Sequence, residues 1–290
     1  MAALLMENAT SKDIERELAR LRDAMGDEGP TQRTRVMNHV AWVPERWVDA
    51  AQEVLAGLEE RYPSRVIVLY PRPDDDRDGI DAEVDLRCFA HGQRGTICAE
   101  VVELQLRGAR AAAAASIVEP LLTADLTDFL RWRGDLPFGE PELEKLVAVA
   151  DRLVVDSREW RDPDAAFVRL AELFDRVTVS DIAWARTEPW REAVAQLWPG
   201  CARADRVRVA GPRAEAILLA GWLTARLERD IELDHEPAGE VELVEVDGDP
   251  AVPKWVEAKS ASDLLSDQLD IFSRDPIYEE AVRSFSRVPI

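Results

Sequence analysis

The sequence predicts an α/β protein: an N-terminal mixed sheet with flanking helices, followed by a smaller C-terminal α/β domain. Three observations lead to this fold class. Strand-like segments alternate with helix-like segments along most of the chain. The length of 290 residues favours two domains. Hydrophobic residues at 47% and charged residues at 32% are typical of a folded chain with a heavily charged surface.

The first predicted element is a short helix over Asp13–Met25. Apolar side chains recur there at helical spacing, at Ile14, Leu18, Leu21 and Met25. Gly26–Pro30 then interrupts the pattern, as a linker does. We therefore expect residues 1–30 to form an N-terminal helix and a linker.

Residues 31–176 are predicted to form the N-terminal α/β domain. It begins with a β-α-β unit: a strand over Arg35–Val43, a helix over Glu45–Tyr62 and a buried strand over Ser64–Tyr70. A hairpin of Val84–Ala90 and Thr96–Leu106 follows. The remaining elements are an Ala-rich helix over Ala109–Leu122, a strand over Asp128–Trp132, an apolar helix and strand through Val155, and a helix from Asp162 to about Phe174.

Residues 177–290 are predicted to form the smaller C-terminal α/β domain. Its expected elements are a Trp-rich helix over Glu188–Trp198, a strand over Arg206–Ala210, a helix over Pro212–Glu228, and two or three strands between Ile231 and Val256. Two helices with starts near Ser260 and Asp275 complete the chain, and Pro276 suits a first helical turn.

The charge balance excludes several classes of partner. The chain has 36 Lys and Arg against 57 Asp and Glu, a net charge of −21, which repels nucleic acid and anionic lipid. The longest apolar stretches are too short or too interrupted to span a bilayer, and the N-terminus lacks a basic flank and a long apolar region. We therefore expect a cytoplasmic protein with no nucleic-acid or membrane partner.

Catalytic and cofactor-binding motifs are mostly missing. The sequence has no GxGxxG, GxxxxGK[ST], GxSxG or HExxH pattern. Histidine occurs only at His39, His91 and His235. His39 lies within an apolar strand, where a core histidine with satisfied hydrogen bonds is favoured over a catalytic one. We predict no catalytic residues and no cofactor.

One acidic segment has the spacing of a calcium-binding loop. Its matching positions are Asp74, Asp76, Asp78, Gly79 and Asp85. The position that is usually apolar would be Asp81, and the segment precedes a strand instead of lying between two helices. A solvated acidic turn is therefore the favoured interpretation, and we predict no metal site.

Two of the three cysteines are expected to lie close together. If Ala90 pairs with Thr96 in the hairpin, Cys88 faces Cys98. The favoured interpretation is a reduced pair of thiols in a sheet, and the alternative is a redox switch. Cys201 stands apart. The absence of a CxxC pair argues against a structural zinc site.

Tryptophan is unusually dense in one stretch. Of nine Trp, four fall within forty residues together with several Arg, namely Trp160, Trp184, Trp190 and Trp198. Trp and Arg are the residues most enriched at protein-interface hot spots. Core packing is the alternative, and burial statistics slightly favour it.

At this stretch the sequence resembles the OpcA family, the assembly proteins of glucose-6-phosphate dehydrogenase. The similarity extends over nearly the whole chain, from about residue 10 to about residue 285. Its blocks are Arg35-Val36-Met37-Asn38, Pro63-Ser64-Arg65-Val66-Ile67, Cys98-Ala99-Glu100, Ser116-Ile117-Val118, Phe129 to Pro137, Ala150 to Ser157 and Asp181 to Arg191.

The resemblance implies a non-catalytic partner that promotes assembly and allosteric activation of glucose-6-phosphate dehydrogenase in the oxidative pentose phosphate pathway. It also implies a possible redox partner such as thioredoxin, but we do not assign the family's regulatory cysteines to Cys88 and Cys98 and do not carry that role over. From composition and motif position, our candidate partner-binding residues are Trp132, Arg133, Trp184, Arg186 and Trp190.

The expected mechanism is tighter binding to the active, oligomeric dehydrogenase than to less active forms. A sugar-phosphate-binding sensor or enzyme of carbohydrate metabolism is the first alternative, with an Arg cluster and a helix N-terminus as its binding site. A scaffold that joins other proteins without a kinetic effect is the second.

Overall fold

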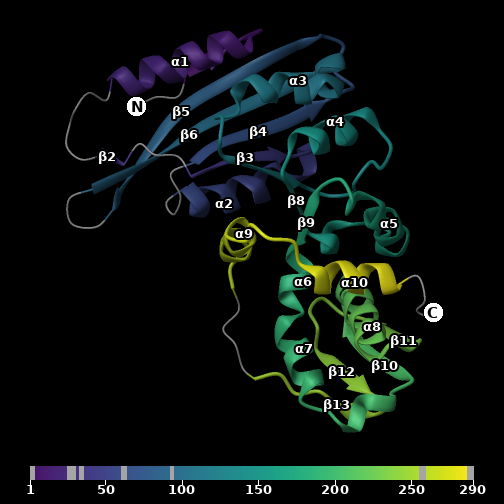
Figure 1. Cartoon of the computed structure of the whole chain (residues 1–290). Helices are drawn as coiled ribbons and strands as arrows, with labels where there is room; N and C mark the ends of the chain where they lie inside the picture. The colour runs from purple at the N-terminus through teal and green to yellow at the C-terminus, as the bar shows by residue number, and fades with distance from the viewer. Residues whose placement is uncertain are drawn as a thin grey trace. The chain divides into compact units, whose positions relative to one another are not determined.

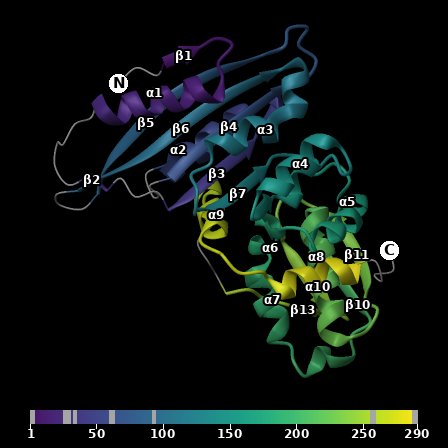
Figure 2. The same ribbon diagram turned by 45° about the horizontal axis from the view of Figure 1, so that its top comes forward.

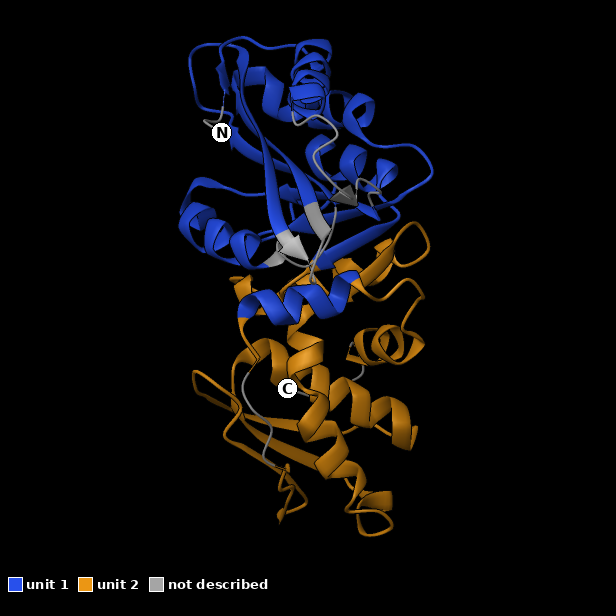
Figure 3. Ribbon diagram, turned by 90° about the vertical axis from the view of Figure 1, so that its left-hand side faces the viewer, with its two compact units in different colours: residues 1–154, 261–269 blue, residues 155–260, 270–290 orange. Residues whose placement is uncertain are grey.

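A computed structural model describes residues 4–24, 31–32, 36–59, 64–91, 95–254 and 259–285. It confirms the α/β class, with a large mixed sheet, flanking helices and a smaller C-terminal sheet. The chain divides into two compact units: unit 1 is Met1–Val154 with Ala261–Leu269, and unit 2 is Val155–Ser260 with Asp270–Ile290 (Figure 3). The domain boundary at residue 177 stays a prediction. The expected linker Gly26–Pro30 and the ends of elements expected at Met25, Arg35, Tyr62 and Val256 lie outside the described residues.

Unit 1 consists of a sheet with helices on both faces (Figure 1). Its strands are β1 (Leu4–Met6), β2 (Thr31–Gln32), β3 (Met37–Trp42), β4 (Ser64–Arg72), β5 (Gly79–His91), β6 (Gly95–Arg107), β7 (Thr127–Trp132) and β8 (Arg152–Val155). Its α-helices are α1 (Ser11–Ala24), α2 (Val48–Glu59), α3 (Ala114–Val118), α4 (Pro141–Val149) and α9 (Ala261–Leu269). Three 3-10 helices are η1 (Glu45–Trp47), η2 (Gly108–Ala113) and η3 (Glu119–Leu121).

The strands of unit 1 lie in the order β1-β5-β6-β4-β3-β7-β8, with β2 beside β6. The five strands β6, β4, β3, β7 and β8 are parallel, whereas β5 is antiparallel to β6 and β1 is antiparallel to β5. Parallel strands are buried on both faces and therefore have nearly continuous apolar sequences. The segment Val66 to Leu69 of β4 fits this rule, because all four side chains are at most 1% exposed.

Helix α1 covers one face of the sheet, on the same side as α3, and α2 covers the other (Figure 1). Ile14, Leu18 and Leu21 of α1 are at most 3% exposed, and each buried side chain of this kind stabilises the fold by about 1.5 to 3 kcal/mol. An ion-pair network lies on the same face, where Arg65 of β4 contacts Glu100 of β6 at 2.7 Å. The helix spacing predicted for this segment is thus confirmed.

The hairpin β5–β6 is longer than predicted, with thirteen residues in each strand (Figures 1 and 2). Gly79 and Asp85 lie within β5, so these two positions of the calcium-like pattern belong to a strand. Asp78 Oδ1 instead accepts a hydrogen bond from the backbone N–H of Ala109 at 2.7 Å. The expected register is confirmed, because Ala90 pairs with Thr96 and Cys88 pairs with Cys98.

The predicted single helix over Ala109–Leu122 is wrong. The segment consists of η2, the short helix α3 and η3. Gly108 has φ +56° at its start, a conformation that glycine adopts without strain. Pro120 lacks the N–H that continues an α-helix, and it falls in the first turn of η3. Gly108 before the Ala run and Pro120 after it therefore keep the α-helix short, despite the high helix propensity of alanine.

Unit 2 has a smaller sheet and its own helices. The strands of this sheet are β10 (Arg206–Gly211), β11 (Glu232–Pro237), β12 (Leu243–Val246) and β13 (Asp249–Pro250), and β9 (Thr178–Asp181) lies outside it. The α-helices of unit 2 are α5 (Pro163–Leu170), α6 (Ile182–Arg186), α7 (Glu188–Ala195), α8 (Arg213–Leu227) and α10 (Pro276–Phe285), and its 3-10 helices are η4 (Ser157–Glu159), η5 (Ala171–Leu173) and η6 (Gly200–Arg203).

The small sheet has the order β11-β10-β12-β13, with β10 parallel to β11 and antiparallel to β12. Val207 and Val209 of β10 are buried, and Arg206 and Arg208 alternate with them on the exposed face. Helix α8 packs against α10 at Gly221, where a Cβ atom would lie 2.3 Å from the backbone oxygen of Ala281. Only glycine permits this approach of the two helices.

Candidate functional site

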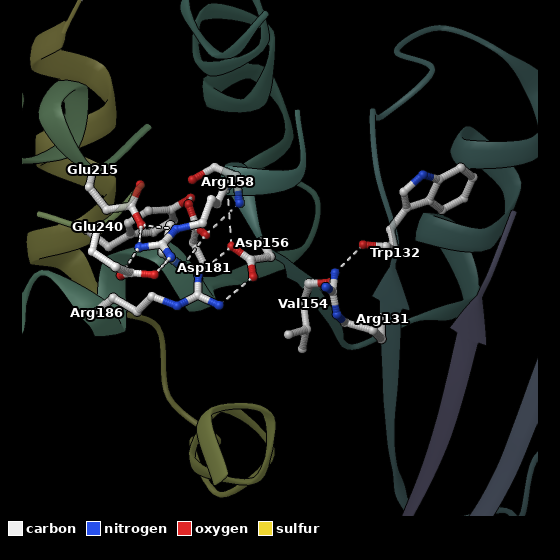
Figure 4. Close-up of polar contacts among 12 residues, drawn as sticks. Arg131, Trp132, Val154, Asp156, Arg158, Asp181, Arg186, Glu215 and Glu240 are labelled. Carbon is white, nitrogen blue, oxygen red and sulfur yellow. Dashed lines mark hydrogen bonds and ion pairs between the residues drawn. The ribbon is translucent and has the colours of Figure 1, made fainter. Parts of the chain in front are cut away.

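Two of the sequence blocks singled out above meet inside unit 2. The first places Asp156 directly after β8, and the second places Asp181 at the end of β9 (Figure 4). Both aspartates cap the helix that follows them. Asp156 accepts a hydrogen bond from the backbone N–H of Arg158, and Asp181 accepts one from that of Ala183. Aspartate is preferred at such positions because its carboxylate satisfies a free N–H of the first turn.

Arg186, at the end of α6, joins the two blocks through Asp156. Its two terminal nitrogens donate to the two carboxylate oxygens of Asp156 at 2.8 and 2.9 Å. The side chain of Asp156 is only 8% exposed and that of Arg186 21%. A two-pronged pair of this kind fixes the orientation of both groups. The contact therefore determines how α6 is held against the segment that follows β8.

Arg158 connects the same region to α8 and to the loop between β11 and β12. Its Nε donates to Glu215 Oε1 at 2.6 Å, and its terminal nitrogens donate to Glu240 at 2.7 and 3.0 Å. Glu215 is completely buried in the first turn of α8, whereas the Glu240 side chain is 73% exposed. Burial raises the pKa of Glu215, although the charge of Arg158 opposes this shift.

Asp181 is the most perturbed carboxyl group of the network. It is 1% exposed; this burial, together with the charge of Asp156, raises its pKa to about 7. The backbone N–H of Ser157 donates to its Oδ1 at 3.0 Å, and the Tyr278 hydroxyl lies 3.3 Å from its Oδ2. The network has two guanidinium groups for four carboxyl groups, so a neutral Asp181 lowers its excess negative charge.

Trp184 packs beside this network on α6. Its Nε1 donates to Asp275 Oδ2 at 2.8 Å, and the guanidinium of Arg191 lies 3.6 Å from the centre of its ring. The ring of Tyr278 lies 5.8 Å away. Trp184 is only 6% exposed, so its surface is used in packing within unit 2.

The chain matches two family models in succession. Residues 56–172 match the model described as the glucose-6-phosphate dehydrogenase subunit N-terminal domain, and residues 177–282 match the one described as its C-terminal domain. The chain belongs to the OpcA family. The resemblance stated from the sequence blocks is confirmed, and those blocks include the Asp156 and Asp181 segments.

Curated relatives with the name OpcA are described by name as OxPP cycle proteins. The chain is 28% identical to that of Nostoc punctiforme over 223 residues, which are 73% of this chain and 48% of the relative. It is 25% identical to that of Synechocystis over 178 residues, which are 57% of this chain and 37% of the relative. The chain thus spans about half the length of the curated relatives it matches, or less.

The partner-binding candidates of this OpcA-family chain lie in different surroundings. Trp132 is 2% exposed, stacks on Trp42 with ring centres 4.8 Å apart, and donates to the backbone oxygen of Asp135 at 3.0 Å. Arg133 is also buried, and its guanidinium lies 4.8 Å from the centre of the Trp47 ring. These contacts hold the end of β7 in place. The partner-binding role assigned to these residues stays a prediction.

Trp190 is half-buried on α7, and Trp198 is 63% exposed at the end of the same helical segment. Backbone hydrogen bonds continue the turn from α7 to Trp198, whose N–H donates to the oxygen of Ala195. Val194, four residues after Trp190, is buried, so Trp190 lies at the margin of the core. The sequence placed Trp198 in the Trp cluster but did not predict that its side chain is exposed, which the structure shows.

The two cysteines of the hairpin form a disulfide in the structure. Cys88 is exposed and Cys98 is half-buried, whereas Cys201 is free and buried. The regulatory role of the pair stays a prediction.

The buried network gives no arrangement for a reaction. Asp156, Glu215 and Glu240 pair with Arg186 or Arg158, and Asp181 accepts backbone N–H bonds. The described part of the chain contains no group of three or more His, Cys, Asp or Glu that could hold a metal ion. In the same part, no helix is both long and apolar enough to cross a bilayer. The network connects η4, α6 and the first turn of α8 to one another.

Sequence reasoning missed Arg158, Glu215 and Glu240. Arg158 stands 57 residues before Glu215 and 82 before Glu240, so no local pattern links them. A signal existed for Asp156 and Asp181, because each is an aspartate between a strand and a helix start, which is typical of a helix cap.

Proposed function

We propose that this chain is a non-catalytic partner of glucose-6-phosphate dehydrogenase that promotes the enzyme's assembly and activates it allosterically. The observation that carries the proposal is the succession of two matches, to the N-terminal and the C-terminal domain of a glucose-6-phosphate dehydrogenase subunit family. The activating effect requires tighter binding to the active, oligomeric form of the enzyme than to its other forms.

The surface proposed for this contact is the outer side of α7 and the turn that follows it, with Trp198 of that turn as its anchor and Trp190 at its margin. A large aromatic side chain that is 63% exposed contributes apolar contact area when a partner covers it. The buried network holds α6, and Thr187 continues directly from α6 into α7. Arg191 of α7 is itself fixed, because its Nε donates to Thr187 Oγ1 at 3.1 Å. The anchor is thus presented by a rigid element, which lowers the entropic cost of binding.

The candidates Trp132, Arg133 and Trp184 are buried, and the Arg186 side chain is 21% exposed. Their side chains pack or pair inside their own units. Substitution at these positions therefore acts on stability before it acts on binding. Trp190 and Arg186 are the candidates with part of their surface exposed.

The test combines size and kinetics. The purified chain is added to glucose-6-phosphate dehydrogenase of the same organism, and oligomer mass is measured by light scattering together with the KM for glucose 6-phosphate. A coupling free energy of about 1 to 3 kcal/mol predicts a five- to 150-fold change in substrate affinity, of the order of known allosteric effects. An unchanged mass and an unchanged KM contradict the proposal.

Two variants locate the surface. Trp198→Ala is expected to weaken binding by about tenfold or more, since hot-spot truncations cost about 2 kcal/mol or more. Phe272→Ala is the matched control, because Phe272 is also 63% exposed in unit 2 but lies outside α7. Equal losses in both variants would argue against α7 as the contact surface, while leaving the partnership itself intact.

A further inference from the structure

The strand order of unit 1 reverses direction between β3 and β7. From β3 the chain passes through α2 to β4, its neighbour on one side, and later from β6 through α3 to β7, its neighbour on the other side. In open parallel sheets, ligands bind beyond the carboxyl ends of the strands at such a reversal. The reason is that the two connections leave toward opposite faces and do not cover the space between them.

The connections of β3 and β7 do leave toward opposite faces. Helix α2 lies on the face of Tyr70, whose hydroxyl interacts with the Gln52 side chain. Val40 points to the other face, where it lines a small cavity with Val118 of α3 and Leu146 of α4. The condition for a site at the reversal is therefore met by this sheet.

Four residues converge at the carboxyl ends of these two strands. After β3, Arg46 and Trp47 lie in η1, and after β7 come Arg133 and Gly134. The guanidinium groups of Arg46 and Arg133 lie 5.5 and 4.8 Å from the centre of the Trp47 ring. Gly134 has φ +78°, and a Cβ atom there would lie 2.6 Å from Arg46 Nη2 and 2.8 Å from Trp47 Nε1. Glycine thus brings its backbone close to both groups.

Arginine side chains lie along the same edge of the sheet, where Arg72 contacts Glu45 at 3.4 Å and Arg107 pairs with Asp81. Arg72 and Arg107 are the last residues of β4 and β6 and are paired in register. Arg46 has a half-exposed side chain (51%), and its contact with Asp135 is long, at 3.4 Å. An incoming anion can therefore replace Asp135 at this guanidinium with little loss.

The indole N–H of Trp47 adds a hydrogen-bond donor at the same place. It is buried and has no hydrogen-bond partner among the described residues. A buried donor without an acceptor costs free energy, and an acceptor that reaches it restores the bond. Two guanidinium groups and an indole N–H close to one another suit the several acceptor oxygens of a phosphate.

We propose that Arg46, Trp47, Arg133 and the backbone at Gly134 bind the phosphate group of a small phosphorylated metabolite. The arginines supply charge-assisted hydrogen bonds, and Trp47 fixes their planes by stacking. This site lies within unit 1 and is separate from the α7 surface. It does not depend on the partnership proposed above, and it would make the chain responsive to metabolite concentration.

The test follows the indole N–H of Trp47 by NMR in the full chain, with Trp47→Phe used for assignment. Inorganic phosphate and glucose 6-phosphate are titrated separately, which distinguishes a free ion from a phosphorylated metabolite. We expect a saturable shift of this signal, with tighter binding of the sugar phosphate. Calorimetry on the same samples gives the affinity. No saturable shift with either probe would overturn the proposal.

Arg46→Gln tests the role of charge. Because the Arg46 side chain is half-exposed, the variant is expected to fold, and it should lose about tenfold or more in affinity. Arg16→Gln is the matched control, since Arg16 is 68% exposed on α1 and pairs with Asp13 of the same helix at 3.0 Å. Equal affinity in Arg46→Gln and the unmodified chain would overturn the site, as would an equal loss in Arg16→Gln. Trp47→Phe keeps a ring but lacks the N–H, and calorimetry should show weaker binding for it as well.

Discussion

The guanidinium of Arg191 lies 3.6 Å from the centre of the Trp184 ring, and the same ring donates its N–H to Asp275. The indole is thus covered on one face by a cation and bonded at its edge to a carboxylate. Burial lowers the pKa of Arg191, while nearby carboxylates including Asp275 oppose this shift. The charge of Asp275 and the face of Trp184 together compensate for the lost hydration of the arginine.

Trp184→Ala is therefore expected to destabilise the chain by about 3 to 5 kcal/mol, as truncations of large buried aromatic side chains do. Trp184→Phe keeps much of the packing but loses the bond to Asp275, and a loss of about 1 to 2 kcal/mol is expected. Urea unfolding measures both values. A Trp184→Ala variant with unchanged stability and lost activation of the dehydrogenase would instead identify Trp184 as a direct partner contact.

The Arg158–Glu215 pair predicts a strong asymmetry between single and double variants. Arg158→Met leaves the completely buried Glu215 without its cation and should cost about 3 to 5 kcal/mol. Adding Glu215→Leu removes the orphaned charge and should recover most of that loss. Glu240→Gln is the control, because its side chain is 73% exposed and surface pairs contribute at most about 1 kcal/mol. Additive losses in the double variant would contradict this account.

The parallel core was predictable from local sequence, and the buried network was not. Apolar runs such as Val66 to Leu69 identify central strands directly. The hairpin register followed from one assumed pair, Ala90 with Thr96. In contrast, Glu215 becomes a partner of Arg158 only after the intervening segments have folded. The return of α9 to unit 1, where Ser262 donates to the backbone oxygen of Val54, likewise leaves no local pattern.

The Cys88–Cys98 disulfide predicts a measurable difference between oxidised and reduced chains. Intact mass without reductant should be lower by two hydrogen atoms, and thiol titration should find only Cys201, after unfolding. Closing so short a loop should add about 2 to 3 kcal/mol of stability. Because Cys88 is exposed, thioredoxin is expected to reduce the pair in the folded chain. Two free thiols in the untreated protein would support the reduced pair expected from the sequence.

Asp181 predicts a fall in stability as the pH rises. Its pKa of about 7 in the folded chain lies above the ordinary 3.8, so between these values the folded state holds more protons than the unfolded state. The stabilisation is complete below pH 3.8 and is lost as the pH rises through 7, by about 4 kcal/mol at most. Asp181→Asn should remove this contribution of Asp181 and leave the pH dependence of the other groups. Its amide oxygen can still accept the same N–H bonds.

The control for that measurement is Asp175→Asn, since Asp175 is 86% exposed and its contact with Arg283 is 3.4 Å long. Unfolding free energies at several pH values between 4 and 8 give the slopes. If Asp181→Asn keeps the slope of the unmodified chain, Asp181 is ionised throughout this range and the charge excess of the network is balanced elsewhere.

We expect His39 to make the free energy of unfolding rise with pH, which is opposite in sign to the effect of Asp181. The sequence predicted a core histidine, and the zero exposure of His39 confirms this. The expected hydrogen bonds are wrong, because neither ring nitrogen has a partner among the described residues. The strand position explains this, because Val66 and Phe129 are its paired neighbours in β4 and β7. Burial, together with the charge of Arg131, lowers its pKa to about 4.

Between pH 4 and 6.5 the unfolded state therefore binds more protons at His39 than the folded state does. Its contribution is complete above pH 6.5 and is lost as the pH falls through 4, by about 3 kcal/mol. Over this range the slopes of His39 and Asp181 oppose each other, so the unmodified chain should show a shallow dependence. His39→Leu should uncover the falling slope of Asp181, and Asp181→Asn the rising slope of His39. The double variant should be as shallow as the unmodified chain, and a His39→Leu slope equal to that of the unmodified chain would show that His39 does not contribute.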